Sequence, residues 1–210
     1  ILFEELSRAR PGYGFLMEER GAVEGADRTH RWIVDPLDGT TNYVHGLPQF
    51  CTSIALERAG QLLAGVVYDP TADECFAAAA GCGATLNGQP IRTSDVTTLP
   101  QAMVAASFAP RTRRTDPTIH EFLNVLERAQ AVRRMGSSAL NLCYVAAGRL
   151  DGYWANDTKS WDVAAGWLIV REAGGTVVAP DGGEPDLVKP RFVAASQSAL
   201  ADELRATLRA

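Results

Sequence analysis

The 210-residue chain lacks the features that mark disulfide scaffolds, zinc sites and membrane proteins. It has three histidines and four cysteines, and its cysteines form no C-x-x-C pair and have no histidine at metal-ligand spacing. We therefore expect reduced, mostly buried thiols, as in a cytoplasmic protein. No run of about eighteen apolar residues occurs and no signal peptide opens the chain, so we expect a cytoplasmic location and no membrane partner.

A large excess of positive charge is also missing. The net charge is −5 at pH 7, so nucleic acid is not the expected partner. Repeats and linkers are absent too, and we predict a single domain over residues 1–210, with subdomains of approximately 1–100 and 101–210. The chain starts at Ile1 without an initiator methionine, in a helix-like segment. We therefore expect that a further N-terminal helical segment is missing from it.

The first half of the chain is predicted to form a short helix and then a meander of antiparallel strands. Trp32-Ile33-Val34 favours a strand, which Pro36 should end because proline has no N–H to donate. Asn87-Gly88 is a strong signal for a two-residue hairpin. The predicted segments are a helix over 1–12, an extended run over 13–21, a polar loop over 20–30, a strand over 31–36, two strands over 51–70 joined at Ala59-Gly60, and antiparallel strands over 74–91.

From about Gln101 onward the pattern changes to alternating strands and helices. We predict strands over 102–108, 131–136, 150–157, 176–180 and 191–196. We predict helices over 118–130 with Ile119, Phe122, Leu123 and Leu126 on one apolar face, from Ser137 or Ser138 to 149, over 161–175 and over 198–210. The whole pattern predicts an α+β fold, a layered α-β-α-β-α sandwich with a meander-like antiparallel sheet in its first half and a mixed α/β second half.

The stretch "WIVDPLDGTTNYVHG" places two carboxylates three residues apart at the end of a predicted strand. Pro36 fixes the turn between Asp35 and Asp38, so both side chains can converge on one point that the Leu37 carbonyl also faces. Two carboxylates and a backbone oxygen are ligands that suit Mg²⁺. The alternative is an ordinary turn that Asp38 begins and Asp35 caps.

Gly39-Thr40-Thr41 follows at once and resembles the start of a helical turn. The free N–H groups of such a turn would bind a phosphate. Haloacid-dehalogenase-type phosphatases carry D-x-D-G-T, with one residue between the acids. Two residues separate the acids here, so the mechanism of those enzymes, in which the first acid is the nucleophile, is excluded.

Two further acidic positions can be interpreted in two ways. Asp162 lies at the start of the predicted helix 161–175, where it could be a plain N-cap. A helix start also holds a carboxylate rigidly, and the small residues 164–166 leave room for a ligand. Glu18 and Glu19, taken alone, would belong to a solvated turn.

Taken together, "MEER", "DPLDGTT" and "WDVAAG", in this order and at these separations, resemble the signature of the inositol monophosphatase family of lithium-sensitive, magnesium-dependent phosphatases. The resemblance runs through nearly the whole chain. It includes "GQLLAGVVYDP", "GCGATLNGQPI", "GSSALNLCYVAAGRLDGYW" and "REAGG".

The resemblance implies a homodimeric phosphatase that hydrolyses a small phosphate ester with two to three Mg²⁺ ions per site and is inhibited by lithium. The implied metal ligands are Glu18, Asp35, the Leu37 carbonyl, Asp38 and Asp162. The implied catalytic residues are Glu18, Asp38 and Thr40, of which Glu18 and Thr40 would orient the attacking water. The implied substrate contacts are Asp38, Gly39, Thr40, Gly136, Ser137, Ser138, Asp157 and Asp162.

The chain departs from the family pattern at three places. Met17 stands where glycine is usual before the Glu-Glu pair, and the N-terminal segment that contributes a mobile loop over the metals is not in the chain given. Ala155 occupies the position of a glutamate that binds sugar hydroxyls. Asp157 lies two residues further on and, in a regular strand, on the same face, so we expect it to be a candidate for that contact.

The expected substrate is inositol 1-phosphate. Because the hydroxyl-binding glutamate is missing, histidinol phosphate, fructose 1,6-bisphosphate and 3′-phosphoadenosine 5′-phosphate remain alternatives. A function of another class is a regulatory partner of RNA or of a transcription complex. The retained acids favour the enzyme.

Overall fold

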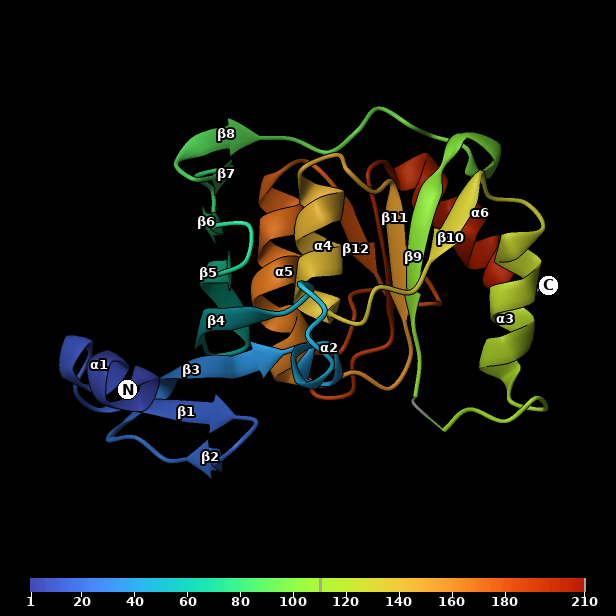
Figure 1. Cartoon of the computed structure of the whole chain (residues 1–210). Helices are drawn as coiled ribbons and strands as arrows, with labels where there is room; N and C mark the ends of the chain where they lie inside the picture. Colours follow the sequence, from blue (N-terminus) through green and yellow to red (C-terminus); the bar gives the residue numbers. More distant parts are fainter. Residues whose placement is uncertain (110, 210) are drawn as a thin grey trace.

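The computed structural model describes residues 1–109 and 111–209 and confirms the α+β fold of layered sheets and helices (Figure 1). An eight-stranded sheet has the order β2-β1-β3-β4-β5-β6-β7-β8, and a five-stranded sheet has the order β10-β9-β11-β13-β12. Helices α4 and α5 lie between the two sheets, α3 and α6 cover the outer side of the smaller sheet, and α1 packs at the β1–β3 end of the larger one.

The elements of the larger sheet and its helices come first in the chain. They are α1 (Leu2–Ala9), β1 (Tyr13–Met17), β2 (Gly21–Val23), β3 (Asp27–Asp38), α2 (Thr40–Val44), β4 (Cys51–Arg58), β5 (Gln61–Asp69), β6 (Glu74–Ala79), β7 (Ala84–Leu86) and β8 (Gln89–Ile91). The remaining elements are η1 (Leu99–Gln101), β9 (Met103–Ser107), α3 (Pro117–Leu126), β10 (Ala131–Arg133), α4 (Ser138–Ala146), β11 (Gly152–Ala155), α5 (Ser160–Glu172), β12 (Thr176–Val178), β13 (Phe192–Ala195) and α6 (Ser198–Leu208).

The predicted hairpins are confirmed. Ala59-Gly60 joins β4 to β5, and Asn87-Gly88 joins β7 to β8. All four residues have positive φ, between 48° and 87°, as the two-residue turns of twisted hairpins require.

The prediction of a polar loop over 20–30 is wrong. β2 and the first part of β3 lie there, and Val23 pairs with Phe15 while His30 pairs with Arg58. These segments take strand conformation because neighbouring backbones supply hydrogen bonds, although the first residues of β3 carry polar side chains.

Pro36 also does not end its strand. In the ladder with β4, Asp35 pairs with Ser53 and the next pair is Asp38 with Cys51, so Pro36 and Leu37 form a two-residue bulge. The bulge accommodates a residue that cannot donate a ladder hydrogen bond. Because Ser53 and Cys51 are two residues apart, Asp35 and Asp38 lie on the same face of the sheet, whereas a regular strand would place them on opposite faces.

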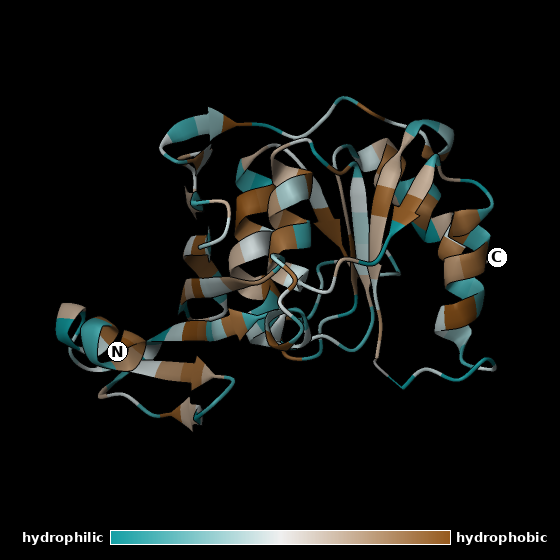
Figure 2. Cartoon of the chain, viewed as in Figure 1, coloured by the Kyte–Doolittle hydropathy of each residue, from teal (hydrophilic) through white to brown (hydrophobic). Residues whose placement is uncertain are grey.

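The middle layer is packed closely by small residues. A Cβ added to Gly166 of α5 would lie 2.6 Å from the side chain of Leu142 of α4, and one added to Gly65 of β5 would lie 2.9 Å from the backbone of Ala165. The main hydrophobic cluster fills this region, and Figure 2 shows hydrophobic residues concentrated on these helices and the strands that face them.

The apolar face predicted for α3 is only partly right. Phe122 and Val125 pack toward the core beside Trp154, but Leu123 and Leu126 are 46% and 48% exposed. All four cysteines are free, with Cys51 and Cys143 buried. Among the described residues, none of the helices has the length and apolar character needed to cross a membrane.

Candidate functional site

Three carboxylates from two distant segments meet where β3 ends and α5 begins. Oxygen atoms of Asp35, Asp38 and Asp162 all lie within 4.8 Å of one another. Asp35 and Asp38 are buried, with 2% and 9% of their surface exposed. The bulge in β3 directs the first two acids to one face, and the start of α5 adds the third.

A contact between the sheet and α5 explains the position of Asp162. Ser53, the ladder partner of Asp35, is buried, and its hydroxyl donates to the Trp161 carbonyl at 3.3 Å. The residue next to Asp162 is thereby fixed to the strand beside Asp35. The simpler interpretation, that Asp162 is the N-cap, is wrong. Helix α5 begins at Ser160, and its N-cap is Lys159. Its carboxylate accepts a hydrogen bond from the Lys159 backbone N–H at 2.9 Å, the reciprocal contact of a capping box.

Asp38 is held by the start of α4. Its Oδ2 accepts hydrogen bonds from the Ser137 hydroxyl at 2.6 Å and from the Ala139 backbone N–H at 2.8 Å. Ser137 is the N-cap of α4, and its hydroxyl also accepts from the Leu140 N–H at 3.2 Å. The N-terminal end of a helix favours a negative charge. Burial raises the pKa of Asp38, and these hydrogen bonds act in the opposite direction.

The other two acids show the cost of collecting like charges. Burial, followed by the charge of Asp38, raises the pKa of Asp35 to about 9, although the Leu37 N–H donates to its Oδ1 at 2.9 Å. Burial is also the largest cause that raises the pKa of Asp162 to about 7. Closely spaced carboxylates that cannot all ionise by themselves are suited to hold a cation.

Glu18 lies directly after β1 and is exposed. Its backbone N–H donates to the Val34 carbonyl at 3.3 Å, which places it beside the residue before Asp35. Glu18 does not belong to the compact group of three, but its charge raises the pKa of each of them. The four acids offer only oxygen atoms as metal ligands, and this set of ligands fits a hard divalent cation such as Mg²⁺.

The predicted helical turn after Asp38 is confirmed as α2, with Gly39 as its N-cap at φ 91°. Glycine is needed there because a Cβ would lie 2.7 Å from the Gln49 carbonyl. The Thr40 hydroxyl donates to the Leu37 carbonyl at 3.0 Å. The structure therefore brings Leu37, Gly39 and Thr40 together beside the acids.

Asn42 is a residue that the sequence analysis missed. Its buried amide donates to the carbonyls of Gln49 and Met135, each at 2.8 Å. Gly136 packs against it with φ 89°, and a Cβ there would lie 2.7 Å from the Asn42 Nδ2. Asn42 thus joins α2 to the segment before α4. A single asparagine in a short helix carries no sequence signal for this role.

A cavity of about 490 Å³ opens beside the acids. Four of the predicted site residues line it, namely Gly136, Ser138, Asp157 and Asp162. Ser137 is instead fully buried behind the wall. Arg134 was missed; it also lines the cavity, with its guanidinium 4.3 Å over the Phe108 ring and a hydrogen bond to the Phe108 carbonyl at 3.1 Å.

The regular strand assumed for Asp157 is not found. β11 ends at Ala155, and Asp157 has a left-handed backbone with φ 65°. The turn nevertheless brings the exposed Asp157 to the cavity wall. Ala155 is fully buried in the core and does not line the cavity.

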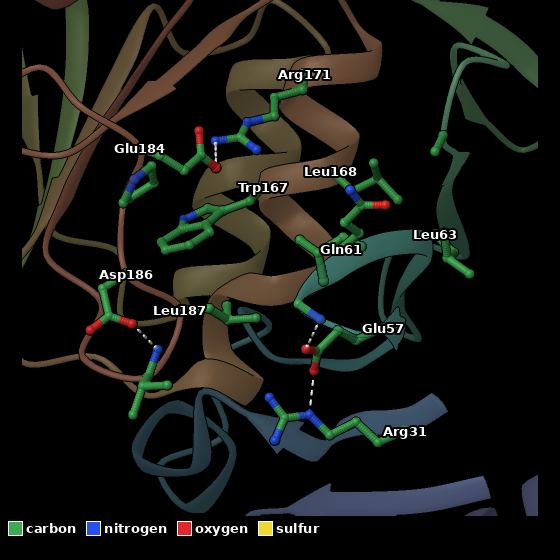
Figure 3. A pocket seen from close by; sticks show the side chains of 15 residues that line it. Arg31, Glu57, Gln61, Leu63, Trp167, Leu168, Arg171, Glu184, Asp186 and Leu187 are labelled. Atoms are coloured by element: carbon green, nitrogen blue, oxygen red, sulfur yellow. Dashed lines mark hydrogen bonds and ion pairs between the residues drawn. The ribbon is translucent and has the colours of Figure 1, made fainter. Parts of the chain in front are cut away.

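A larger cavity of about 580 Å³ lies elsewhere, between the β4–β5 turn, α5 and residues 184–188 (Figure 3). Four of its charged groups are already paired, Arg31 with Glu57 and Arg171 with Glu184 at 2.6 Å, and Asp186 accepts the Val188 backbone N–H at 2.8 Å. It contains no converging set of acids. The smaller cavity beside Asp162 is therefore the candidate active site, in spite of its volume.

Comparisons with known proteins found relatives over nearly the whole chain. The model of the inositol monophosphatase family matches residues 1–210. The chain is 50% identical over 198 residues to an inositol-1-monophosphatase of Mesorhizobium japonicum, covering 94% of this chain and 74% of that protein. It is 43% identical over 196 residues to the Nus factor SuhB of Pasteurella multocida, covering 93% and 73%. The crystal structure of the extragenic suppressor protein suhB from Bartonella henselae superimposes with a TM-score of 0.93 at 44% identity, covering 99% of this chain and 80% of that one.

Proposed function

The chain belongs to the inositol monophosphatase family, and from this premise we propose that it hydrolyses a small phosphomonoester, with inositol 1-phosphate as the expected substrate. The observation that carries the proposal is the convergence of Asp35, Asp38 and Asp162 within 4.8 Å. Gathering three like charges, two of them buried, is unfavourable unless a cation compensates for them. A purely structural site would have no use for such a cluster.

The residues proposed to hold two to three Mg²⁺ ions are Glu18, Asp35, Asp38, Asp162 and the Leu37 carbonyl. When bound, Mg²⁺ supplies positive charge for the phosphate oxygens and makes water more acidic. The protein's contribution is rigidity: Asp38 and Asp162 are fixed by backbone N–H groups at 2.8 Å and 2.9 Å. Exposed Glu18 is the acid with the most freedom to adjust.

Thr40 and Gly39 are proposed to handle the reacting groups. The Thr40 hydroxyl donates to the Leu37 carbonyl at 3.0 Å, so its oxygen can accept a hydrogen bond from a water. The same water would donate its second hydrogen bond to the Glu18 carboxylate. The N–H groups at the start of α2 would hold the phosphate. This assignment makes Thr40 and Glu18 responsible for orienting the nucleophile.

The substrate side of the site favours neutral polyols. Among the described residues of the cavity wall, Arg134 is the one cation, and Asp157 is the one anion besides Asp162. Arg134 donates hydrogen bonds and Asp157 accepts them, and hydroxyl groups can satisfy both. Histidinol phosphate, fructose 1,6-bisphosphate and 3′-phosphoadenosine 5′-phosphate also carry polar groups that Arg134 and Asp157 could bind, so they stay as alternative substrates.

Self-association, in the form of a homodimer, is part of the proposal. Tyr43, Val44 and Leu47 follow the phosphate-binding turn and are 55%, 73% and 54% exposed. Adjacent exposed apolar side chains are typical of an interface. Sedimentation at micromolar concentration tests this, and a monomer would contradict it. Inhibition by lithium and a cytoplasmic location are proposed on the family premise alone.

The test is phosphate release from the four candidate esters, measured side by side with and without Mg²⁺. We expect Mg²⁺-dependent release, fastest from inositol 1-phosphate and reduced by lithium. Glu18→Gln should lower it strongly, while the matched variant Glu19→Gln of the neighbouring exposed residue should retain it. Failure to hydrolyse any small ester in Mg²⁺ would contradict the proposed function.

A second function is favoured by the relative named Nus factor SuhB. In this alternative the chain is a regulatory partner of RNA or of a transcription complex. Co-purification of such a complex with the Asp35→Asn variant would show binding that does not depend on phosphatase chemistry. Loss of binding in that variant would tie it to the acid site.

A further inference from the structure

Tyr153 lies behind the wall of the candidate active-site cavity, and its hydroxyl group contacts residues that line the cavity, Ser107 and Ser138. The residue is fully buried in β11. Its hydroxyl donates to the Ser138 Oγ at 3.0 Å. Ser138, the first residue of α4, lines the cavity. A buried tyrosine O–H needs a hydrogen-bond partner, and the partner here is a cavity residue.

The position of Tyr153 is fixed from every side. β11 runs between β9 and β13, and Tyr153 pairs with Ala105 and Ala194 in the two ladders. Its ring contacts the Phe192 ring edge-on, with centroids 5.4 Å apart. A ring held in this way cannot follow a substrate, so it can only orient the group to which it is bonded.

Ser138 gains a defined direction from this bond. A serine hydroxyl has one hydrogen to donate and two lone pairs. One lone pair accepts from Tyr153, and among the described residues no acceptor is found for the Ser138 hydrogen. That hydrogen is available to an acceptor in the cavity, and the bond from Tyr153 makes it a stronger donor.

We propose that Tyr153 is a positioning residue that, through the Ser138 hydroxyl, selects esters carrying a hydroxyl group close to the phosphate. The inference rests on the proposed phosphatase function and names the substrate class more closely. A substrate hydroxyl would accept from Ser138 and donate to Asp157, which lines the same cavity. Ser138 and Asp157 would together take the role of the family's hydroxyl-binding glutamate, whose position is occupied here by the buried Ala155.

The test compares two esters of the same ring, inositol 1-phosphate and cyclohexyl phosphate, which has no hydroxyl groups. Tyr153→Phe removes only the O–H and keeps the ring. We expect it to raise KM for inositol 1-phosphate about three- to tenfold, the value of one hydrogen bond, with a much smaller change in kcat. KM for cyclohexyl phosphate should stay within about twofold.

The variants Ser138→Ala and Tyr153→Phe/Ser138→Ala complete the comparison. Ser138→Ala should raise KM for inositol 1-phosphate at least as much, and adding Tyr153→Phe should then have little further effect. Equal effects of Tyr153→Phe on both esters, or additive effects of the two substitutions, would overturn the proposal. If Tyr153→Phe fails to fold, the response of Ser138→Ala to the two esters decides in the same way.

The outcome is separable from that of the proposed function. If the wild-type protein hydrolyses both esters in Mg²⁺ but prefers inositol 1-phosphate no more strongly than the Tyr153→Phe variant does, only the positioning role is refuted. A wild-type protein that hydrolyses neither ester refutes the proposed function.

Discussion

The acid side and the hydroxyl side of the site differ in how their side chains are stabilised. On the acid side, two buried carboxylates and the partly buried one of Asp162 lie within 4.8 Å of one another, and burial raises the pKa of all three. On the hydroxyl side, Tyr153 and Ser138 form a neutral hydrogen bond at 3.0 Å, and Arg134 and Asp157 carry opposite charges on one wall.

This difference has consequences for the energetics of the site. The acid side has unfavourable electrostatics that a bound cation relieves without protonation of the acids, so each acid should be indispensable for turnover. The hydroxyl side needs no cation and acts through single hydrogen bonds, each worth about 0.5–1.5 kcal/mol. Substitutions on the acid side should therefore change rates by orders of magnitude, and those on the hydroxyl side should change substrate preference.

The largest effect is expected from Asp162→Asn. Asparagine can still accept the Lys159 N–H bond that Asp162 accepts at 2.9 Å, so α5 should keep its start. The loss of one cation ligand should lower kcat by about a hundredfold or more. Asp186→Asn, a substitution of an exposed acid at the larger cavity, is the control and should keep full activity. An active Asp162→Asn enzyme would break the distinction between the two sides.

The second prediction concerns stability against pH. Because the pKa values of Asp35 and Asp162 are raised to about 9 and about 7, the folded metal-free protein binds protons that the unfolded chain releases near pH 4. Its stability should therefore fall progressively as pH rises from about 4 through about 7 to 9.

Thermal unfolding in EDTA measures this fall, and Mg²⁺ should reverse it because it binds the ionised acids. The gain in Tm on adding Mg²⁺ should consequently be larger at pH 8.5 than at pH 5.5. Asp35→Asn removes the group whose pKa is raised to about 9 and should flatten the EDTA profile. A profile that stays steep in this variant would assign the pH dependence to other groups.

The parts of this site that sequence alone predicts are those with local causes. The D-P-L-D spacing indicated convergence of Asp35 and Asp38, although the cause is a two-residue bulge in β3 and not a turn that ends the strand. Gly39 predicted its turn because few residues adopt φ 91°. Asp162 could be assigned to the same site only through family resemblance. Its position depends on the contact from Ser53 to Trp161, which joins segments 108 residues apart.

Residues whose role depends on tertiary packing were not predicted. Asn42 and Tyr153 stand in an ordinary helix and an ordinary strand, and their partners lie 93 and 15 residues away. Parts of the segment 20–30, in β2 and at the start of β3, form strand because β1 and β4 supply ladder partners. Leu123 and Leu126 fitted the helical period, but the sheet meets α3 at Phe122 and Val125.

A smaller effect is expected from Ser137→Ala, which lies between the two sides. The substitution removes the N-cap of α4 and one of the hydrogen bonds to Asp38, while the bond from the Ala139 N–H remains. Loss of a cap costs about 0.5–2 kcal/mol, and Mg²⁺ affinity should weaken several-fold because Asp38 is less firmly held. Chemical denaturation and Mg²⁺ titration of activity measure the two effects. Ser198→Ala at the start of α6, where Ser198 is not the cap, should change neither.

The smallest and most selective effect is expected from Asp157→Asn. Asparagine keeps an acceptor oxygen for a substrate hydroxyl but removes the negative charge that balances Arg134 on the cavity wall. KM for inositol 1-phosphate should rise only about two- to threefold, since one charged hydrogen bond becomes a neutral one. The wall then carries an uncompensated cation, so fructose 1,6-bisphosphate, with its second phosphate, should become a better substrate relative to inositol 1-phosphate. Competition between the two esters measures the shift, and a preference that is unchanged would show that Asp157 and Arg134 do not act on the same bound molecule.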